Sequence, residues 1–175
     1  MAHRREGAPT AWVLPGLGAY GPDPALKDKL SLFGQFVGDW DLDRWWIERD
    51  GSEHRNTGRV YFRWILGGRA VQDIWSAIGG DPSQETAVGT TIRFYDAAKD
   101  TWTSLWIAPK YGLLVRFTVH RRGNEIVLET DQDGYPERWI FSDITPAAFR
   151  WRAEESHDRG TTWERTEEMR ARRRR

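Results

Sequence analysis

Short runs of alternating apolar and polar residues constrain the fold of this chain more than any other feature. One run is Gly-Asp-Trp-Asp-Leu-Asp at 38–43, and another is Thr-Trp-Thr-Ser-Leu-Trp at 101–106. A period of two places successive side chains on opposite faces of a strand, so it predicts strands with one buried face. Tryptophan accounts for 11 of the 175 residues, and most lie in such runs. A sheet with so many large aromatic side chains encloses either a bulky core or an aromatic cavity.

The alternation recurs in ten segments, and turn-forming sequences such as Asp-Gly and Gly-Gly separate them. These turns are typical of hairpins. Strands joined by hairpins, without helices between them, predict an antiparallel up-and-down meander, which avoids exposed edges by closing into a barrel. The ten predicted strands cover approximately 39–48, 57–65, 69–78, 87–96, 101–108, 113–121, 124–131, 136–144, 148–156 and 162–171.

One short helix is predicted before the strands. Asp23 and Pro24 supply an N-cap and a first-turn proline, and apolar residues follow at 26, 30, 33 and 37. The competing α+β cone fold of small cyclases and isomerases needs several helices, so we favour an all-β barrel domain at 23–172 with this helix plugging one end.

The segment 1–22 is predicted to be a separate N-terminal arm. Proline and glycine make it irregular, yet it carries apolar side chains that favour docking. Two interpretations stay open: a lid over the mouth of a cavity, or a strap packed on the outside of the barrel. The apolar residues of the arm are Trp12, Val13, Leu14, Leu17 and Tyr20.

Composition excludes several classes of function. Lys plus Arg and Asp plus Glu both number 26, so no net charge attracts nucleic acid or an anionic membrane, and we expect neither as a partner. The absence of cysteine excludes disulfides, thiolate nucleophiles and cysteine-ligated zinc. No apolar run resembles a membrane span of ~20 residues or a signal peptide, so we expect a cytoplasmic protein.

Cofactor and metal binding are not expected either. The four histidines, at 3, 54, 120 and 157, show no convergent spacing. His120 is the only one that we place within a strand, and haem binding through it is not expected. No nucleophile elbow, phosphate-binding loop or dinucleotide fingerprint occurs, so hydrolase, kinase and dehydrogenase activities lack support.

Several motifs resemble a known superfamily of barrels. Gly38-Asp39-Trp40, directly after the helix, resembles the G-x-W start of lipocalins and other calycins. The segments at 67–75, 89–96, 141–145 and 156–163 look like a bacterial family of lipocalin-like barrels of mostly unknown function. The resemblance covers about 32–172 and implies the barrel fold but no reaction, because that family has no established catalytic motif. Arg159 departs from it, since a second glycine is usual there.

Charged residues that interrupt an apolar strand face are candidates for a functional site, because burying an unpaired charge costs on the order of several kcal/mol. Such residues could orient and polarise a carbonyl or phenol, or could be internal Arg–Asp pairs that satisfy one another. Arg165 also interrupts a face, and Arg150, Arg152 and Glu154 would be internal only in the opposite register. The predicted ligand-binding set, three polar anchors on a tryptophan wall, is Arg44, Trp46, Trp64, Asp73, Trp75, Trp106, Arg138 and Trp151.

The first functional hypothesis is a barrel that binds a small hydrophobic or aromatic molecule in a tryptophan-lined cavity. The alternative is a cofactor-independent cyclase or isomerase of specialised metabolism acting in that cavity, for which proximity and one acid–base group suffice. A third hypothesis is a barrel filled by its own tryptophans that works through its outer surface. A homodimer is considered for each.

Overall fold

The structure is a computed structural model that describes residues 17–79 and 83–175. A short 3₁₀ turn, Pro24–Leu26, leads into helix α1, Lys27–Gly34. The strands follow as β1 (Gly38–Ile47), β2 (Glu53–Ile65), β3 (Ala70–Ile78), β4 (Glu85–Asp96), β5 (Thr101–Ala108), β6 (Leu113–Arg122), β7 (Glu125–Thr130), β8 (Glu137–Ser142), β9 (Ala148–Glu155) and β10 (Glu164–Arg173).

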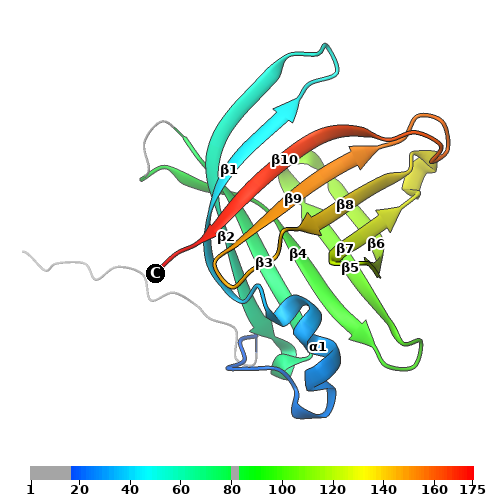
Figure 1. Ribbon diagram of the computed structural model, residues 1–175. Coiled ribbons are helices and arrows are strands. Elements are labelled where there is room, and N and C mark those ends of the chain that lie inside the picture. The colour runs from blue at the N-terminus through cyan, green and yellow to red at the C-terminus, as the bar shows by residue number, and fades with distance from the viewer. Residues whose placement is uncertain (1–16, 80–82) are drawn as a thin grey trace, which may run out of the picture.

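The ten strands form one closed antiparallel barrel (Figure 1). Each strand pairs with the next along the chain, and β1 closes the barrel by pairing with β10 from Trp40 opposite Arg173 to Trp46 opposite Glu167. The predicted up-and-down barrel with one short N-terminal helix is therefore confirmed, and the cone fold is excluded. The predicted strand ends differ by a few residues, most at β2, which begins at Glu53.

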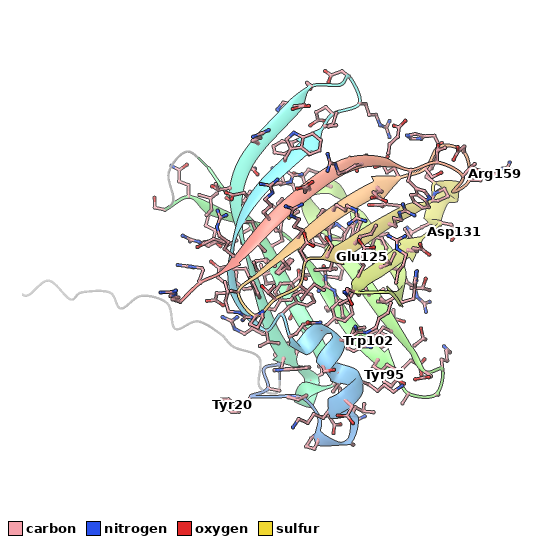
Figure 2. The ribbon with its side chains drawn as sticks, viewed as in Figure 1. Tyr20, Tyr95, Trp102, Glu125, Asp131 and Arg159 are labelled. Carbon is pink, nitrogen blue, oxygen red and sulfur yellow. The ribbon has the colours of Figure 1, made fainter. Side chains whose placement is uncertain are left out.

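Helix α1 closes one end of the barrel. The Asp23 side chain accepts a hydrogen bond from the Ala25 backbone N–H at 2.9 Å, as the N-cap prediction requires. Phe33 is fully buried and meets the Trp102 ring edge-on, with a centroid distance of 5.0 Å. Figure 2 shows Trp102 and Tyr95 beside the helix. We call this the helix end; the opposite end, where β1 turns into β2 and β5 into β6, is the mouth.

Packing at the helix end depends on a glycine. The Cβ of any other residue at Gly34 would lie 2.6 Å from Cζ2 of Trp64, so the last turn of α1 can rest on the indole only because it lacks a side chain. Trp64 is buried by this contact.

The arm lies at the helix end where it can be described. The Ala19 N–H donates to the Trp64 carbonyl at 3.0 Å, and the Leu66 N–H donates to the Leu17 carbonyl at 3.2 Å. These bonds hold 17–19 against the end of β2, away from the mouth. Trp12, Val13 and Leu14 lie outside the described residues, so the lid and strap interpretations of the arm stay predictions. No helix in the described ranges is long and apolar enough to cross a membrane.

Candidate ligand-binding site

Alternate residues of every strand point into the barrel, and the space that they leave toward the mouth is a cavity of about 270 Å³. Its wall is largely aromatic and aliphatic, and it contains two ion pairs, each between an arginine and a carboxylate. The lining residues are Leu42, Arg44, Val60, Phe62, Asp73, Trp75, Val88, Thr91, Arg93, Trp106, Ala108, Tyr111, Leu113, Trp139, Phe141, Phe149, Trp151, Glu167 and Met169.

Three tryptophans form a continuous aromatic wall. Trp139 of β8 meets Trp106 at a centroid distance of 5.7 Å and Trp151 at 5.3 Å, both in edge-to-face geometry, which is a favoured arrangement of aromatic rings. Trp106 lies flat over Gly89 of β4, where an added Cβ would be 2.5 Å from its Cη2 atom. Tight packing against the barrel wall therefore fixes the rings that face the cavity.

A buried ion pair lies toward the helix end. Arg93 Nη1 donates to Asp73 Oδ2, and the two side chains are only 3% and 5% exposed. Asp73 Oδ1 also accepts from the backbone N–H of Thr91 at 3.3 Å. The guanidinium carbon of Arg93 lies 5.1–5.7 Å from the ring centroids of Phe33, Phe62 and Phe141. A single unpaired charge in this buried, aromatic environment would be strongly destabilising, so each side chain of the ion pair needs the other.

A second ion pair lies nearer the mouth. Arg44 of β1 donates from Nε and Nη2 to the two carboxylate oxygens of Glu167, at 2.5 and 3.0 Å. The Arg44 guanidinium carbon lies 4.0 Å from the ring centroid of Trp46 and 5.1 Å from that of Trp75. Its charge is thus held between two indole rings and a carboxylate, in a fixed orientation.

Two carboxylate side chains lie opposite each other at the mouth. Glu137 of β8 lies directly opposite Glu155 of β9, and the Trp139 indole N–H donates to Glu137. Burial raises the pKa of Glu137, and the charges of Glu155 and Glu167 raise it further, against the lowering effect of the Trp139 hydrogen bond.

The structure brings five of the eight predicted site residues together on the cavity wall: Arg44, Asp73, Trp75, Trp106 and Trp151. The other three lie elsewhere. Trp46 packs on Arg44 and donates to Glu48 at 3.0 Å, and Trp64 packs under α1. Arg138 lies on the outer face, where it pairs with Glu154 and stacks on Trp163 at 4.0 Å.

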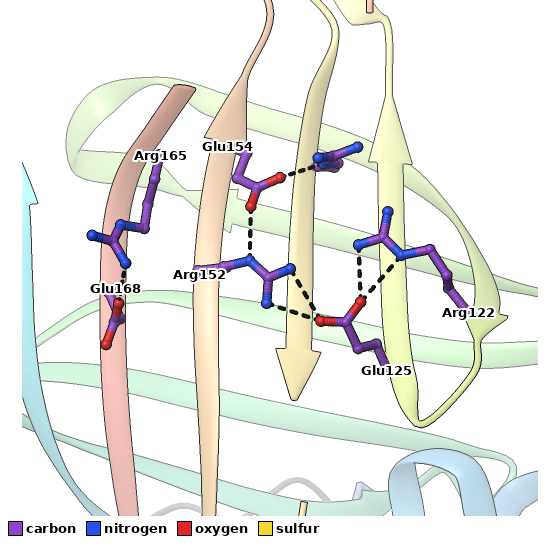
Figure 3. A network of polar contacts seen from close by, with 7 residues as sticks. Arg122, Glu125, Arg152, Glu154, Arg165 and Glu168 are labelled. Atoms are coloured by element: carbon purple, nitrogen blue, oxygen red, sulfur yellow. Dashed lines mark hydrogen bonds and ion pairs between the residues drawn. The ribbon is translucent and has the colours of Figure 1, made fainter. Parts of the chain in front are cut away.

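The environment of Arg138 is an ionic network on the outside of the barrel. Arg152 links Glu125 and Glu154, with bonds of 3.0 and 2.7 Å, and Arg122 also pairs with Glu125 (Figure 3). The pKa of Glu125 is lowered, because the hydrogen bonds and charges of Arg122 and Arg152 outweigh the opposing effect of burial. Arg152 and Glu154 therefore lie on the outer face of the barrel. The opposite register, which would have turned them inward, does not occur.

Sequence reasoning missed Arg93, Trp139 and Glu167. Arg93 sits in Thr-Ile-Arg-Phe-Tyr, where both strand faces are mixed, so the pattern does not reveal which one is buried. A bulge between Arg165 and Glu167 shifts the register of β10, turning Glu167 inward. Arg165, which the alternation placed on the apolar face, instead pairs with Glu168 at 2.7 Å. No turn signal marks such a bulge.

His120, the histidine considered for haem, lies on the outer face of β6. Its side chain is 48% exposed, and its Nδ1 lies 3.9 Å from Glu129. No group of three potential metal ligands gathers within 17–79 and 83–175. The expectation that no cofactor or metal binds stays a prediction.

Comparisons with known proteins support the fold. No protein-family model matches this chain, and no curated protein matches its sequence. The S-type phycobiliprotein lyase CPES from Guillardia theta is similar in structure, with a TM-score of 0.57 and 13% identity over 83% of this chain and 92% of that one. Rv2717c from M. tuberculosis is also similar, with a TM-score of 0.58 and 11% identity over 88% and 99% of the two chains. At these identities the likeness shows a shared fold and nothing finer.

Proposed function

We propose that this barrel binds a small hydrophobic or aromatic molecule in its tryptophan-lined cavity. The observation that carries the proposal is the cavity of about 270 Å³, open at the mouth and walled by Trp75, Trp106, Trp139 and Trp151. Small-molecule pockets are typically ~300–1,000 Å³, mostly apolar, with a few polar groups. A compact ligand of one or two rings suits the lower end of this range.

An apolar rim at the mouth supports the proposal. Tyr111 and Leu113 line the cavity and are 59% and 48% exposed, and Leu114 and Tyr135 beside them are also exposed. Exposed apolar side chains around an opening favour the entry of an apolar ligand. The motif resemblance to lipocalin-like bacterial barrels points the same way, as does the likeness in fold to a protein named as a phycobiliprotein lyase.

Tryptophan fluorescence and calorimetry with a panel of aromatic and aliphatic probes test the proposal. Aromatic probes should quench the emission at micromolar concentration. Trp106→Leu and Trp151→Leu should each weaken binding at least tenfold, whereas Trp45→Leu on the outer face should leave it unchanged. If no probe changes the emission or releases heat, the barrel is filled by its own side chains and the proposal is wrong.

The second candidate is a cofactor-independent cyclase or isomerase acting in the same cavity. Glu137 favours it, because burial raises the pKa of its carboxyl group, and a perturbed carboxyl group near a cavity mouth is a candidate acid–base group. A bound probe recovered with altered structure and unchanged mass would support isomerisation. Glu137→Gln should then abolish conversion and retain binding. Probes recovered unaltered would count against the enzyme.

Cytoplasmic location and homodimer formation are further parts of the proposal. Light scattering coupled to size-exclusion chromatography tests the dimer, and a mass of about 20 kDa would exclude it.

A further inference from the structure

Three inward-facing hydrogen-bond donors have no partner among the described residues: Arg93 Nε, Ser104 Oγ and Trp75 Nε1. Arg93 and Ser104 are 2% and 0% exposed, and Arg93 and Trp75 line the cavity. Buried polar groups in folded proteins are almost always paired, because an unmade hydrogen bond costs stability. The described residues supply none of these three atoms with a partner, and a bound molecule can provide one.

Strand register brings two of these groups together. Arg93 of β4 lies directly opposite Ser104 of β5, and both side chains point inward. The guanidinium of Arg93 uses Nη1 to hold Asp73, which leaves its Nε–H unused. Two donors from neighbouring strands thus lie side by side toward the helix end, with Arg93 on the cavity wall and Ser104 next to it in the β5 strand.

The chemistry of the free groups selects an acceptor. Arginine and tryptophan N–H groups donate hydrogen bonds and accept none, and a serine hydroxyl can also donate. A ligand group that met Arg93 and Ser104 would therefore be an oxygen with free lone pairs.

The charge of the cavity excludes an ionic ligand group. Its two guanidinium groups, on Arg44 and Arg93, are each paired with one carboxylate, on Glu167 and Asp73. A ligand carboxylate or ammonium would enter a low-dielectric site with no counter-charge left for it. The acceptor should therefore be neutral.

We propose that the deep end of the cavity recognises the carbonyl oxygen of a neutral aromatic ketone, quinone or amide, which accepts hydrogen bonds from Arg93 Nε and Ser104 Oγ. The inference rests on the proposed function, since it names the class of ligand for the same cavity. The Asp73–Arg93 ion pair holds the donor in place, and the tryptophan wall receives the ring system.

Three matched probes test it by calorimetry: methyl naphthyl ketone, its isopropenyl counterpart in which CH₂ replaces the carbonyl oxygen, and naphthoate. The ketone should bind about tenfold more tightly than the alkene, as a hydrogen bond to a charged donor implies. Naphthoate should bind no better than the alkene. Equal affinity for ketone and alkene, or tightest binding of naphthoate, would overturn the inference.

Variants assign the preference to the named groups. Ser104→Ala should reduce the ketone-to-alkene ratio at least threefold, whereas Ser142→Ala on the outer face should keep it. The paired variant Asp73→Leu/Arg93→Met removes the Arg93 donor without leaving a lone buried charge, and it should also reduce the ketone-to-alkene ratio at least threefold. A ratio that survives in the paired variant would contradict the assignment. If the alkene binds to the wild-type protein without a ketone preference, only this inference fails. If neither these three probes nor any member of the panel above binds, the proposed function fails with it.

Discussion

Arg44 and Glu167 form a two-point ion pair across the seam at which the first and last strands close the barrel. The pair therefore contributes both to the cavity wall and to the joint between β1 and β10. Its partners are 18% and 20% exposed, so solvent screens it only in part.

Removing one partner should weaken this seam. Arg44→Met leaves the Glu167 carboxylate without its ion pair and should lower the free energy of unfolding by about 1–3 kcal/mol. The double variant Arg44→Met/Glu167→Leu should recover part of that loss, because it leaves no lone charge. Urea denaturation of the three proteins provides the comparison. A double variant no more stable than Arg44→Met would contradict this account.

The Asp73–Arg93 pair should show a larger coupling, because it is more deeply buried. Arg93→Met alone should destabilise the protein by about 3–5 kcal/mol, since an unpaired carboxylate remains inside the barrel. Asp73→Leu/Arg93→Met should restore most of this stability. A double-mutant cycle measured by denaturant unfolding gives the coupling directly, and additive effects of the two changes would show that the residues act independently.

Sequence periodicity predicted the fold closely because every strand has one face in the core and because glycine and aspartate mark the turns. The residues of the site were harder to predict from the sequence. Arg44, Asp73 and Trp106 could be placed in the cavity because each shares a strand face with clearly apolar neighbours. Arg138 was placed wrongly because its strand face contains the apolar Ile140, which suggested an inward face. Ile140 is instead buried on the outside of the barrel, beneath the ionic network. Glu167 depended on a bulge in β10, which only cross-strand packing determines.

The contact between helix and barrel should be sensitive to one methyl group. Gly34→Ala places a Cβ 2.6 Å from the Trp64 indole and should destabilise the protein by about 1–3 kcal/mol through overpacking. Gly21→Ala is the matched control, because an added Cβ there has no heavy atom within 4 Å. Thermal melts of both variants test this. Equal melting temperatures would mean that α1 can move away from the barrel without cost.

Acid should loosen the turn between β9 and β10. Asp158 accepts hydrogen bonds from the Thr162 N–H and Oγ1, both at 2.7 Å, and from Ser156 Oγ at 2.9 Å. The Thr162 bonds are the main cause that lowers the pKa of Asp158 to about 2. Because the folded pKa lies below the unfolded one, this stabilisation is present above pH ~4 and is lost as the pH falls toward 2.

Comparison of wild-type protein with Asp158→Asn across this pH range checks the effect. The melting temperature of the variant should be lower at pH 6, and the difference should shrink as the pH falls from 4 to 2. A difference that is constant over this range would assign the effect to geometry rather than to ionisation.

Two truncations separate the interpretations of the arm. Removal of 1–16 should weaken ligand retention if that segment covers the mouth, and should leave binding unchanged if the arm is only a strap. Removal of 1–22 also deletes the hydrogen bonds of Ala19 to Trp64 and of Leu17 to Leu66, so it should lower the melting temperature further. Calorimetry and thermal melts of both truncations distinguish these outcomes, and melting temperatures equal to that of the full chain would rule out the strap.

Closure of the barrel by its first and last strands has a consequence for folding. The Arg44–Glu167 contact joins residues 123 positions apart, and the loop entropy of such a distant pairing makes folding slow. During synthesis β1 has only β2 as a neighbour until β10 leaves the ribosome, so one edge of the growing sheet stays open throughout. Pulse proteolysis of stalled nascent chains should show protection of β1 only after residue 173 has emerged.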